Sequence, residues 1–345
     1  MNFTQSQFTR AARLSVAMII SFVYVAYIGI SDGIWVIMTC AIILFDNPTL
    51  GGTINKSHLR FWGTFFAAGF SLIFIIGFAN NVIINLCGIV IGTFLAAYWY
   101  MDTAQGYIGG LISWTLPIIL LNNNDIKSAF LRLINIVIGI VISYIMLRYF
   151  YPEYARDNML RSMKNTLIEL KALLLSISDS QLNAEQIQSL YLNHESKILT
   201  EINSFNRWQT EAKWETKKAP EYVDAAVLVY LHIRRLYRLL SVVIFHFNCH
   251  EIRHNLKIQP RFTQIRQQLD EIIDALEKNQ KQYYIPEILN QNNKDIASES
   301  SNHDEYKHYQ NLSIQTITDI IQIEIDVIIT NLIKLFNSRQ THNYY

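Results

Sequence analysis

The sequence predicts an all-α membrane protein in two parts, with six transmembrane helices in residues 1–150 and a cytoplasmic α-helical domain in residues 151–345. Of the 29 Lys and Arg and 28 Asp and Glu residues, only seven basic and four acidic ones lie in the first part. All 13 glycines lie there too. A glycine-rich segment with few charges is typical of closely packed membrane helices, whereas a charged segment without glycine indicates long helices in water.

Uncharged stretches divide the first part into six spans, because a membrane helix needs about 20 apolar residues. The first stretch follows Arg10 and Arg13 and lacks a small-residue cleavage signal, so we expect it to be retained. The second is short unless it continues through residues 47–50, and the third is long enough for two helices that turn at Asn80-Asn81. The stretches are Leu14–Ile30, Gly33–Phe45, Phe61–Met101, Thr103–Asn124 and Phe130–Phe150.

Basic residues predict the orientation of these spans. With the N-terminus inside, the outer flanks carry only Lys127 and Arg132, and the inner flanks carry eight Lys and Arg residues. Because positively charged loops stay in the cytoplasm, both termini are expected there, in a multi-pass protein of the inner (plasma) membrane. Tryptophan and tyrosine residues near the span ends match an aromatic belt.

A faint internal repeat relates the two halves of the membrane part. Gly33 is followed 27 residues later by Arg60, and Gly106 is followed 26 residues later by Arg132. Because each unit would hold three spans, the second would be inverted relative to the first. The sequence therefore predicts a possible 3+3 inverted repeat that brings spans three and six together.

Arg60 and Arg132 are the main candidates for function. An ionisable side chain in a membrane helix is costly, so its default interpretation is a pathway, here for an anion. The alternative is that both arginines lie near helix starts and reach the lipid headgroups. Trp35, Trp62 and Tyr107 are predicted to offer aromatic contacts along the same path.

Three carboxylates, Asp32, Asp46 and Asp102, are candidates for proton coupling. Asp32 and Asp102 precede the repeated glycine–aromatic pairs, where capping of the following helix is an alternative role. Asp46 opens the segment 46–53, which contains Pro48, Gly51 and Gly52. This segment is either a broken helix that faces a cavity or a plain cytoplasmic turn.

Five helices are predicted in the cytoplasmic part, where the charged residues of the third argue against a seventh span. The segment 290–311 and the tail after Arg339 have little apolar content and are expected to be mobile. The helices are the one opened by Pro152 and reaching Ser178, with an apolar stripe from Met159 to Leu174, and Ala184–Trp208, Glu221–His250, Arg261–Gln282 and Ile314–Phe336.

Other function classes find little support. The net charge of +1 offers no basic excess for nucleic acid, and three cysteines speak against a disulfide framework. His246, His250 and His254 share one helix face, a weak arrangement for a metal, and Arg234, Arg235 and Arg238 are expected to form ion pairs. Without a phosphate-binding glycine loop or a nucleophile motif, we expect no cofactor, no metal and no enzymatic activity.

Several motifs resemble the fusaric acid resistance (FUSC) or aromatic acid exporter family, which is related to the aluminium-activated malate channels of plants. The resemblance covers nearly the whole chain, with Ala67 in place of a family glycine and Thr216 in place of a family proline. The motifs are Arg13, Gly33-Ile34-Trp35-Val36-Ile37-Met38-Thr39, Pro48, Gly51-Gly52-Thr53, Arg60-Phe61-Trp62-Gly63-Thr64, Gly106-Tyr107, the stretch from Arg132 to Gly139, and Ala212-Lys213-Trp214-Glu215.

The resemblance implies export of small organic, mainly aromatic, carboxylates, driven by the proton gradient or the membrane potential. Full-length exporters of this family resemble two such units in one chain, so the resemblance also implies a homodimer, with a periplasmic adaptor protein as a possible partner. Two alternatives remain open. One is a passive organic-anion channel, and the other is a membrane scaffold or sensor through which nothing passes.

Overall fold

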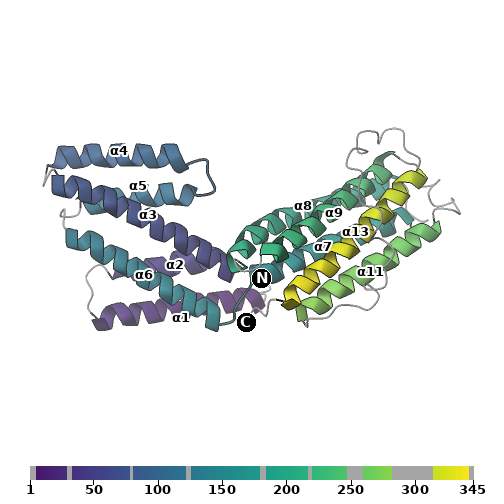
Figure 1. Ribbon diagram of the computed structural model, residues 1–345, viewed down its shortest axis with the longest axis horizontal. Coiled ribbons are helices and arrows are strands. Elements are labelled where there is room, and N and C mark those ends of the chain that lie inside the picture. Colours follow the sequence, from purple (N-terminus) through teal and green to yellow (C-terminus); the bar gives the residue numbers. More distant parts are fainter. Residues whose placement is uncertain are drawn as a thin grey trace. The chain divides into compact units, whose positions relative to one another are not determined.

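The computed structural model describes residues 5–28, 33–77, 81–121, 126–178, 184–216, 220–246, 259–281 and 314–341. Within these ranges every regular element is an α-helix, as predicted (Figure 1). The chain divides into two compact units, Met1–Tyr154 and Ala155–Tyr345. The first contains the apolar helices α1 (Gln5–Ile28), α2 (Ile34–Asp46), α3 (Leu50–Gly77), α4 (Val82–Tyr100), α5 (Gly106–Leu121) and α6 (Ile126–Tyr149).

Four of these helices, α1, α3, α4 and α6, are long and apolar enough to cross a membrane. The other two, α2 and α5, are apolar but have only 13 and 16 residues. At 1.5 Å per residue they rise roughly 20–24 Å, less than the ~30 Å of a hydrocarbon core. Length and composition therefore support four of the six predicted spans and distinguish the other two as a pair of short helices.

Helix α3 begins eleven residues before the predicted start at Phe61. The segment 46–53, predicted as a broken helix or a turn, contains a turn at residues 47–49 and then the first residues of α3. The uncharged-stretch criterion failed here because it excludes Lys56 and Arg60, although both charges have partners within the fold. The prediction that Arg60 lies near a helix start was therefore wrong.

Helix pairs in this unit follow a symmetric pattern. Helix α1 packs on α2 and α6, and α4 packs on α5 and α3. Helix α2 packs on α6 as α5 packs on α3, while α3 and α6 pack on each other. If α1, α2 and α3 are exchanged with α4, α5 and α6, respectively, each of these pairs becomes another one of them, and the α3–α6 pair is unchanged. In Figure 1, α3, α4 and α5 lie on one side of the unit and α1, α2 and α6 on the other.

Arg13, the basic residue that precedes the first predicted span, holds together one end of the unit. The residue is 3% exposed, and its guanidinium donates hydrogen bonds to the carbonyl oxygens of Pro48 (3.1 Å) and Tyr151 (2.7 Å). One turn earlier, Arg10 forms an ion pair with Glu153 at 3.1 Å. Helix α1 is thereby fastened to the α2–α3 turn and to the chain after α6.

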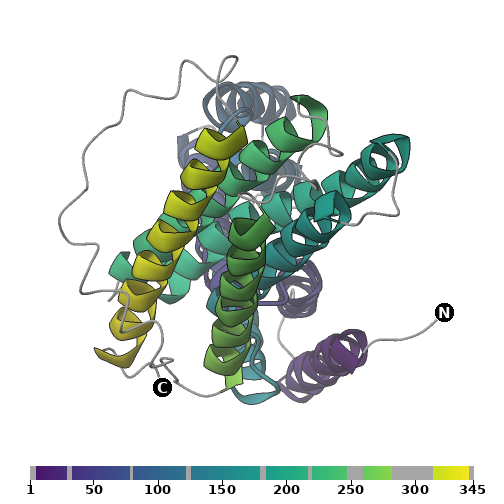
Figure 2. The ribbon, with the colours of Figure 1, turned by 90° about the vertical axis from the view of Figure 1, so that its right-hand side faces the viewer.

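The second unit is a bundle of α7 (Ala155–Ser178), α8 (Ala184–Glu215), α9 (Pro220–His246), α11 (Gln259–Lys281) and α13 (Ile314–Thr341). The predicted stripe from Met159 to Leu174 is buried, as are the isoleucines on one face of α13. Figure 2 shows α11 and α13 in front of the other helices of this unit. Both Glu215 oxygens accept hydrogen bonds from the first backbone N–H groups of α7, at 2.7 and 3.2 Å.

Some boundaries in the second unit differ from the predicted ones. Helix α7 begins at Ala155, so Pro152 precedes the helix instead of opening it. Helix α8 continues past Trp208, and α13 continues past Arg339, so the start of the predicted mobile tail is helical. Apolar periodicity cannot locate ends that continue as polar turns. The segment 290–311 and residues 342–345 lie outside the described residues.

Two neighbouring glycines of α5 allow a direct test of the membrane packing. A Cβ on Gly109 would lie 2.9 Å from the carbonyl oxygen of Ala96 and 2.9 Å from Cβ of Tyr100, so α4 and α5 would have to separate. A Cβ on Gly110 would meet nothing within 4 Å. We expect Gly109→Ala to lower the thermal unfolding midpoint in detergent by several degrees, because overpacking costs about 1–3 kcal/mol. Gly110→Ala should leave the midpoint unchanged or raise it, since alanine favours helix. Equal midpoints for the two variants would contradict this packing.

Candidate functional site

Arg60 lies in the third turn of α3 and is 3% exposed. Its Nε donates a hydrogen bond to Oγ1 of Thr39 on α2 at 3.1 Å. Its Nη1 donates to the phenol oxygen of Tyr107 on α5 at 3.0 Å. A buried guanidinium is tolerated when oxygen atoms accept its hydrogen bonds, and the desolvation cost otherwise reaches several kcal/mol. Arg60 therefore ties together α2, α3 and α5.

Tyr107 stands between two cations of α3. While its hydroxyl accepts from Arg60, its ring lies under the ammonium group of Lys56, 3.8 Å from the ring centroid. Lys56 also forms an ion pair with Asp46, the last residue of α2, at 3.3 Å. A carboxylate, two cations and a phenol thus form one continuous polar cluster, which we call the Arg60 cluster.

Arg132 on α6 is 5% exposed and stacks on the ring of Trp35, with its guanidinium carbon 3.6 Å from the ring centroid. The carbonyl oxygen of Trp35 accepts a hydrogen bond from the Thr39 hydroxyl at 2.6 Å, and this hydroxyl accepts from Arg60. The two predicted arginines are therefore connected through one turn of α2. A guanidinium stacked on tryptophan gains cation–π attraction and keeps its in-plane N–H groups directed sideways.

The two arginines occupy related positions. Each one meets an aromatic residue in the first turn of the short helix that belongs to the other half, Tyr107 on α5 for Arg60 and Trp35 on α2 for Arg132. The separation in sequence from Trp35 to Tyr107 equals that from Arg60 to Arg132. Short hydrophobic segments at corresponding positions of two halves are typical of binding sites in transporters with internal repeats.

Three of the other predicted residues are not part of the Arg60 cluster. Two of them lie in other places, and one lies outside the described residues. Trp62 follows Arg60 by two residues, so it projects from the opposite side of α3, where its indole N–H donates to Nε2 of His58 at 3.0 Å. Asp102 is exposed in the turn before α5, which begins only at Gly106. Asp32 lies outside the described residues.

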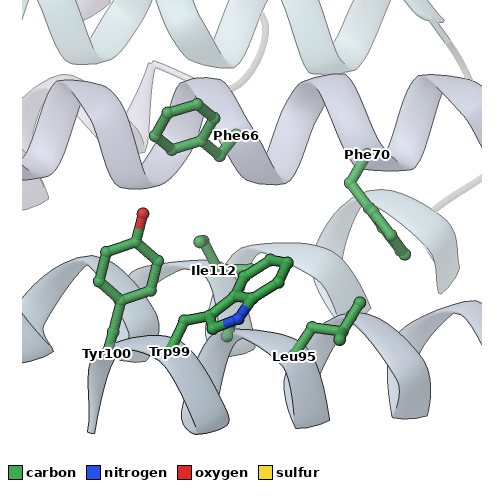
Figure 3. A pocket seen from close by; sticks show the side chains of 8 residues that line it. Phe66, Phe70, Leu95, Trp99, Tyr100 and Ile112 are labelled. Carbon is green, nitrogen blue, oxygen red and sulfur yellow. The ribbon is translucent and has the colours of Figure 1, made fainter. Parts of the chain in front are cut away.

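A cavity of about 280 Å³ lies between α3, α4 and α5 (Figure 3). The labelled side chains around it are apolar or aromatic, and no lining residue carries a formal charge. Such a cavity accommodates an acyl chain or an aromatic ring, but offers no cation for a carboxylate. Its lining residues are Phe66, Phe70, Gly92, Leu95, Ala96, Trp99, Tyr100 and Ile112.

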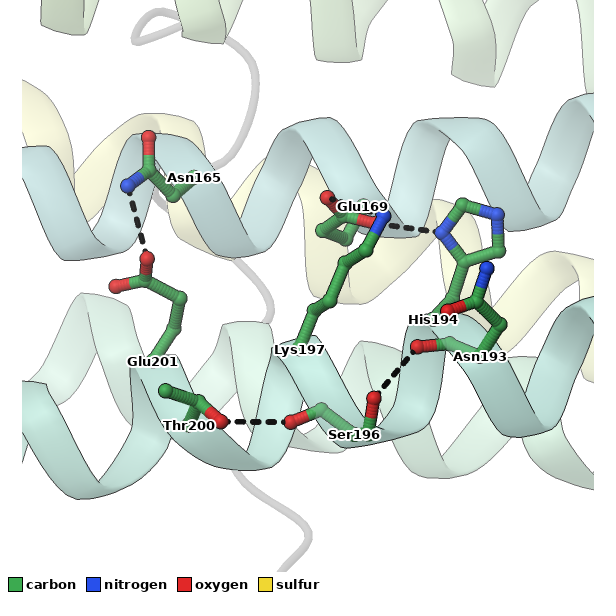
Figure 4. A network of polar contacts seen from close by, with 8 residues as sticks. All are labelled: Asn165, Glu169, Asn193, His194, Ser196, Lys197, Thr200 and Glu201. Carbon is green, nitrogen blue, oxygen red and sulfur yellow. Dashed lines mark hydrogen bonds and ion pairs between the residues drawn. The ribbon is translucent and has the colours of Figure 1, made fainter. Parts of the chain in front are cut away.

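Polar contacts in the second unit join neighbouring helices. Figure 4 shows His194 of α8 directed at Glu169 of α7, with Nδ1 2.5 Å from Oε2, and Asn165 donating to Glu201 at 2.9 Å. His232 of α9 contacts Glu324 of α13 at 2.6 Å. These pairs link helices across the bundle.

The structure bears differently on the two predictions made for this unit, ion pairing by the arginine cluster and a weak metal arrangement of the histidines. Arg235 forms an ion pair with Glu324 at 3.9 Å, which is the kind of role expected for that cluster. Among the described residues no three His, Cys, Asp or Glu side chains are grouped for a metal. His250 and His254, with the side chain of His246, fall outside the described part of the chain.

Burial raises the pKa of three described titratable groups in the bundle, among them the Tyr237 phenol of α9. It raises the pKa of Tyr230 to about 12, and it raises the pKa of the Asp326 carboxyl. Tyr230 stacks on Phe205 with ring centroids 3.7 Å apart, so its phenol is part of the packed core. We regard these groups as structural.

Sequence reasoning missed the roles of Thr39 and Lys56. Thr39 is the acceptor that orients Arg60, and Lys56 covers Tyr107. A signal for Lys56 was present, because Lys56 and Arg60 are four residues apart and therefore neighbours on one helix face. The role of Thr39 depends on how α2 crosses α3, which no local pattern encodes.

Comparison with known proteins places the chain in a family. Residues 7–326 match the model of the fusaric acid resistance protein (FUSC) family, so the chain belongs to that family, as the motifs predicted. A stretch of 156 residues is 28% identical to the multidrug resistance protein MdtO of Escherichia coli (strain K12). This stretch covers 42% of the chain and 22% of MdtO, well under two thirds of that relative. Family membership and the four long apolar helices together identify a membrane protein.

The Arg60–Tyr107 bond can be measured by a double-mutant cycle of Arg60→Met and Tyr107→Phe. We expect each variant to lower the free energy of unfolding in detergent, and the two losses to be non-additive by about 1–3 kcal/mol, because the bond involves a charged donor. The control pairs Arg60→Met with Trp114→Phe, a change at an exposed residue of α5. Additive losses in the Arg60–Tyr107 cycle would contradict a direct interaction.

Proposed function

We propose that the protein exports small organic carboxylates, mainly aromatic ones, across the inner membrane. The observation that carries this proposal is Arg60, a buried cation inside a membrane helix that is held by hydroxyl groups alone among its hydrogen-bond partners in the described residues. A hydroxyl is an exchangeable partner, because a carboxylate accepts the same hydrogen bonds and adds a full charge. Membership of the fusaric acid resistance protein family and similarity to a multidrug resistance protein support an efflux role.

In this proposal the carboxylate of the anion replaces Thr39 or Tyr107 as the acceptor of a hydrogen bond from Arg60. Arg132 provides a second positively charged binding site. The ring of Trp35 faces Arg132, and the ring of Tyr107 faces Lys56 while its hydroxyl bonds to Arg60, so aromatic groups lie beside the cations, which suits an aromatic acid. Trp62 belongs to the opposite side of α3, so we assign it no contact with the transported anion. The ion pair between Asp46 and Lys56 makes Asp46 the favoured described carboxylate for proton coupling.

The proposal includes the topology and the assembly. All six apolar helices form one membrane unit with both termini in the cytoplasm, and the symmetric helix pairs support a 3+3 inverted repeat. MdtO is nearly twice as long as this chain, which leaves room for two such units and supports a homodimer here. A periplasmic adaptor protein is a further proposed partner. Energy would come from the proton gradient or the membrane potential, and the protein would not be an enzyme.

Transport can be tested with the purified protein in liposomes that contain labelled benzoate, with imposed pH and voltage gradients. We expect benzoate flux, reduced at least about tenfold by Arg60→Gln and by Arg132→Gln, since losing one charged contact of about 1.4 kcal/mol changes a rate tenfold. Arg148→Gln is the matched control, because Arg148 is an exposed arginine in the last turn of α6. It should retain wild-type flux.

The gradients distinguish the remaining functions. Flux that requires a pH gradient indicates coupled export, whereas flux that follows voltage and reverses with it indicates a passive anion channel. Absence of flux for benzoate and for a panel of aliphatic carboxylates would overturn both and leave a scaffold or sensor.

A further inference from the structure

Several buried hydroxyl groups of the membrane unit form a hydrogen bond within their own helix. The hydroxyls of Ser21, Thr39, Ser71 and Ser143 each donate to the backbone carbonyl four residues earlier, at 2.6–2.8 Å. This local bond is the usual solution for serine and threonine in an apolar helix, because it leaves no donor exposed to lipid or to the core.

Three hydroxyls of α3 depart from this rule. The side-chain oxygens of Thr53, Ser57 and Thr64 are buried and have no hydrogen-bond partner among the described residues. Their residues are 0%, 8% and 1% exposed. Buried polar groups in proteins almost always have a partner, so these three hydroxyls require one that the described residues do not supply.

The three hydroxyls share one face of α3 with Arg60. At 100° per residue, positions 53, 57, 60 and 64 fall within an arc of about 60°. Along the axis they extend over ~16 Å, roughly half the thickness of the hydrocarbon core. Thr53 and Ser57 lie before Arg60 and Thr64 after it, so the hydroxyls continue from the cation in both directions.

The face is not turned to lipid. One side of α3 packs on α5, where a Cβ on Gly63 would lie 2.8 Å from Cβ of Leu111. The other side carries Leu50 and Ile54, which pack in a cluster with Ala17 and Leu147 of α1 and α6. The row of hydroxyls lies between these two sides, in the interior of the unit where Arg60 meets Thr39.

We propose that Thr53, Ser57 and Thr64 line a hydrated anion route along α3, in which each hydroxyl donates a hydrogen bond to water or to a carboxylate oxygen of the passing anion. This inference rests on the proposed function for the identity of the anion, but not for the hydration. The guanidinium offers donors only, and each hydroxyl is able to donate, so the row can bind ligands that are acceptors, as carboxylates are. The weak, repeated sites on both sides of Arg60 would let an anion leave the cation, which conduction requires.

Hydration of the route can be measured without any transport. Thr53→Cys, Ser57→Cys and Thr64→Cys are each made in the full-length protein in liposomes and treated with a small, negatively charged methanethiosulfonate reagent. Labelling is read at each position by mass spectrometry of peptides, so the native cysteines stay in place. We expect modification at all three positions. Ser21→Cys on α1 is the control, because Ser21 is buried and its hydroxyl bonds to Ala17 and to Cys40, and it should stay unmodified.

The donor role is measured by benzoate flux in the variant Thr53→Val/Ser57→Ala/Thr64→Val, which keeps the side-chain volumes close to the original ones. We expect at least a fivefold loss of flux with an unchanged thermal midpoint, and no loss for Ser71→Ala on the same helix, whose hydroxyl already bonds to Ala67.

The outcomes separate this inference from the proposed function. If the three cysteines are as unreactive as the control while the wild type transports benzoate, the hydrated route is overturned and the function stands. If they react while no carboxylate is transported, the hydration stands and the proposed function fails. Reactive cysteines with full flux in the triple variant would overturn the donor role of the hydroxyls.

Discussion

The burial of one positive charge, that of Arg60, constrains the rest of the membrane unit. A guanidinium inside an apolar helix requires oxygen acceptors within reach, and Thr39 and Tyr107 supply them from two different helices. Both acceptors lie on the short helices α2 and α5, so these must approach α3 at the level of the charge. The close contact of Gly139 on α6 with Thr39 on α2, where an added Cβ would lie 2.7 Å away, keeps α2 in that position.

The symmetric helix pairs give a physical reason for two arginines. In an inverted repeat, the contact made by the third helix of one half with the second helix of the other occurs twice. In the proposed repeat, Arg60 with Tyr107 and Arg132 with Trp35 correspond to these two contacts, and they differ in chemistry, since one is a hydrogen bond to a phenol and the other a stack on an indole. For the proposed anion path, two separate cations are better suited than one deep site, because an ion bound too tightly does not leave.

The helical class and the family could be predicted from the sequence, because charge depletion, glycine content and motif spacing are local signals. Arg60, Arg132, Trp35 and Tyr107 were selected from the same kind of signal, and the structure brings them together in pairs, but their role in function stays a prediction. The length of α3 could not be predicted in this way. A count of uncharged residues stops at Arg60, and it contains no information on the ion pair that Lys56 forms with Asp46. The position of Trp62 was open to prediction, because two residues along a helix reverse the direction of a side chain. The partners of Thr39 and the hydroxyl row depend on how helices cross, which a single sequence does not encode.

Anion binding at Arg60 is the central claim, and the most direct measurement is the thermal unfolding midpoint of the purified protein at increasing benzoate concentration. A ligand that binds only the folded state stabilises it by RT ln(1 + [L]/Kd). We expect the midpoint of the wild type and of Arg148→Gln to rise with benzoate, and that of Arg60→Gln to stay constant. An equal rise in all three would contradict the account, because the anion would then bind without the buried cation.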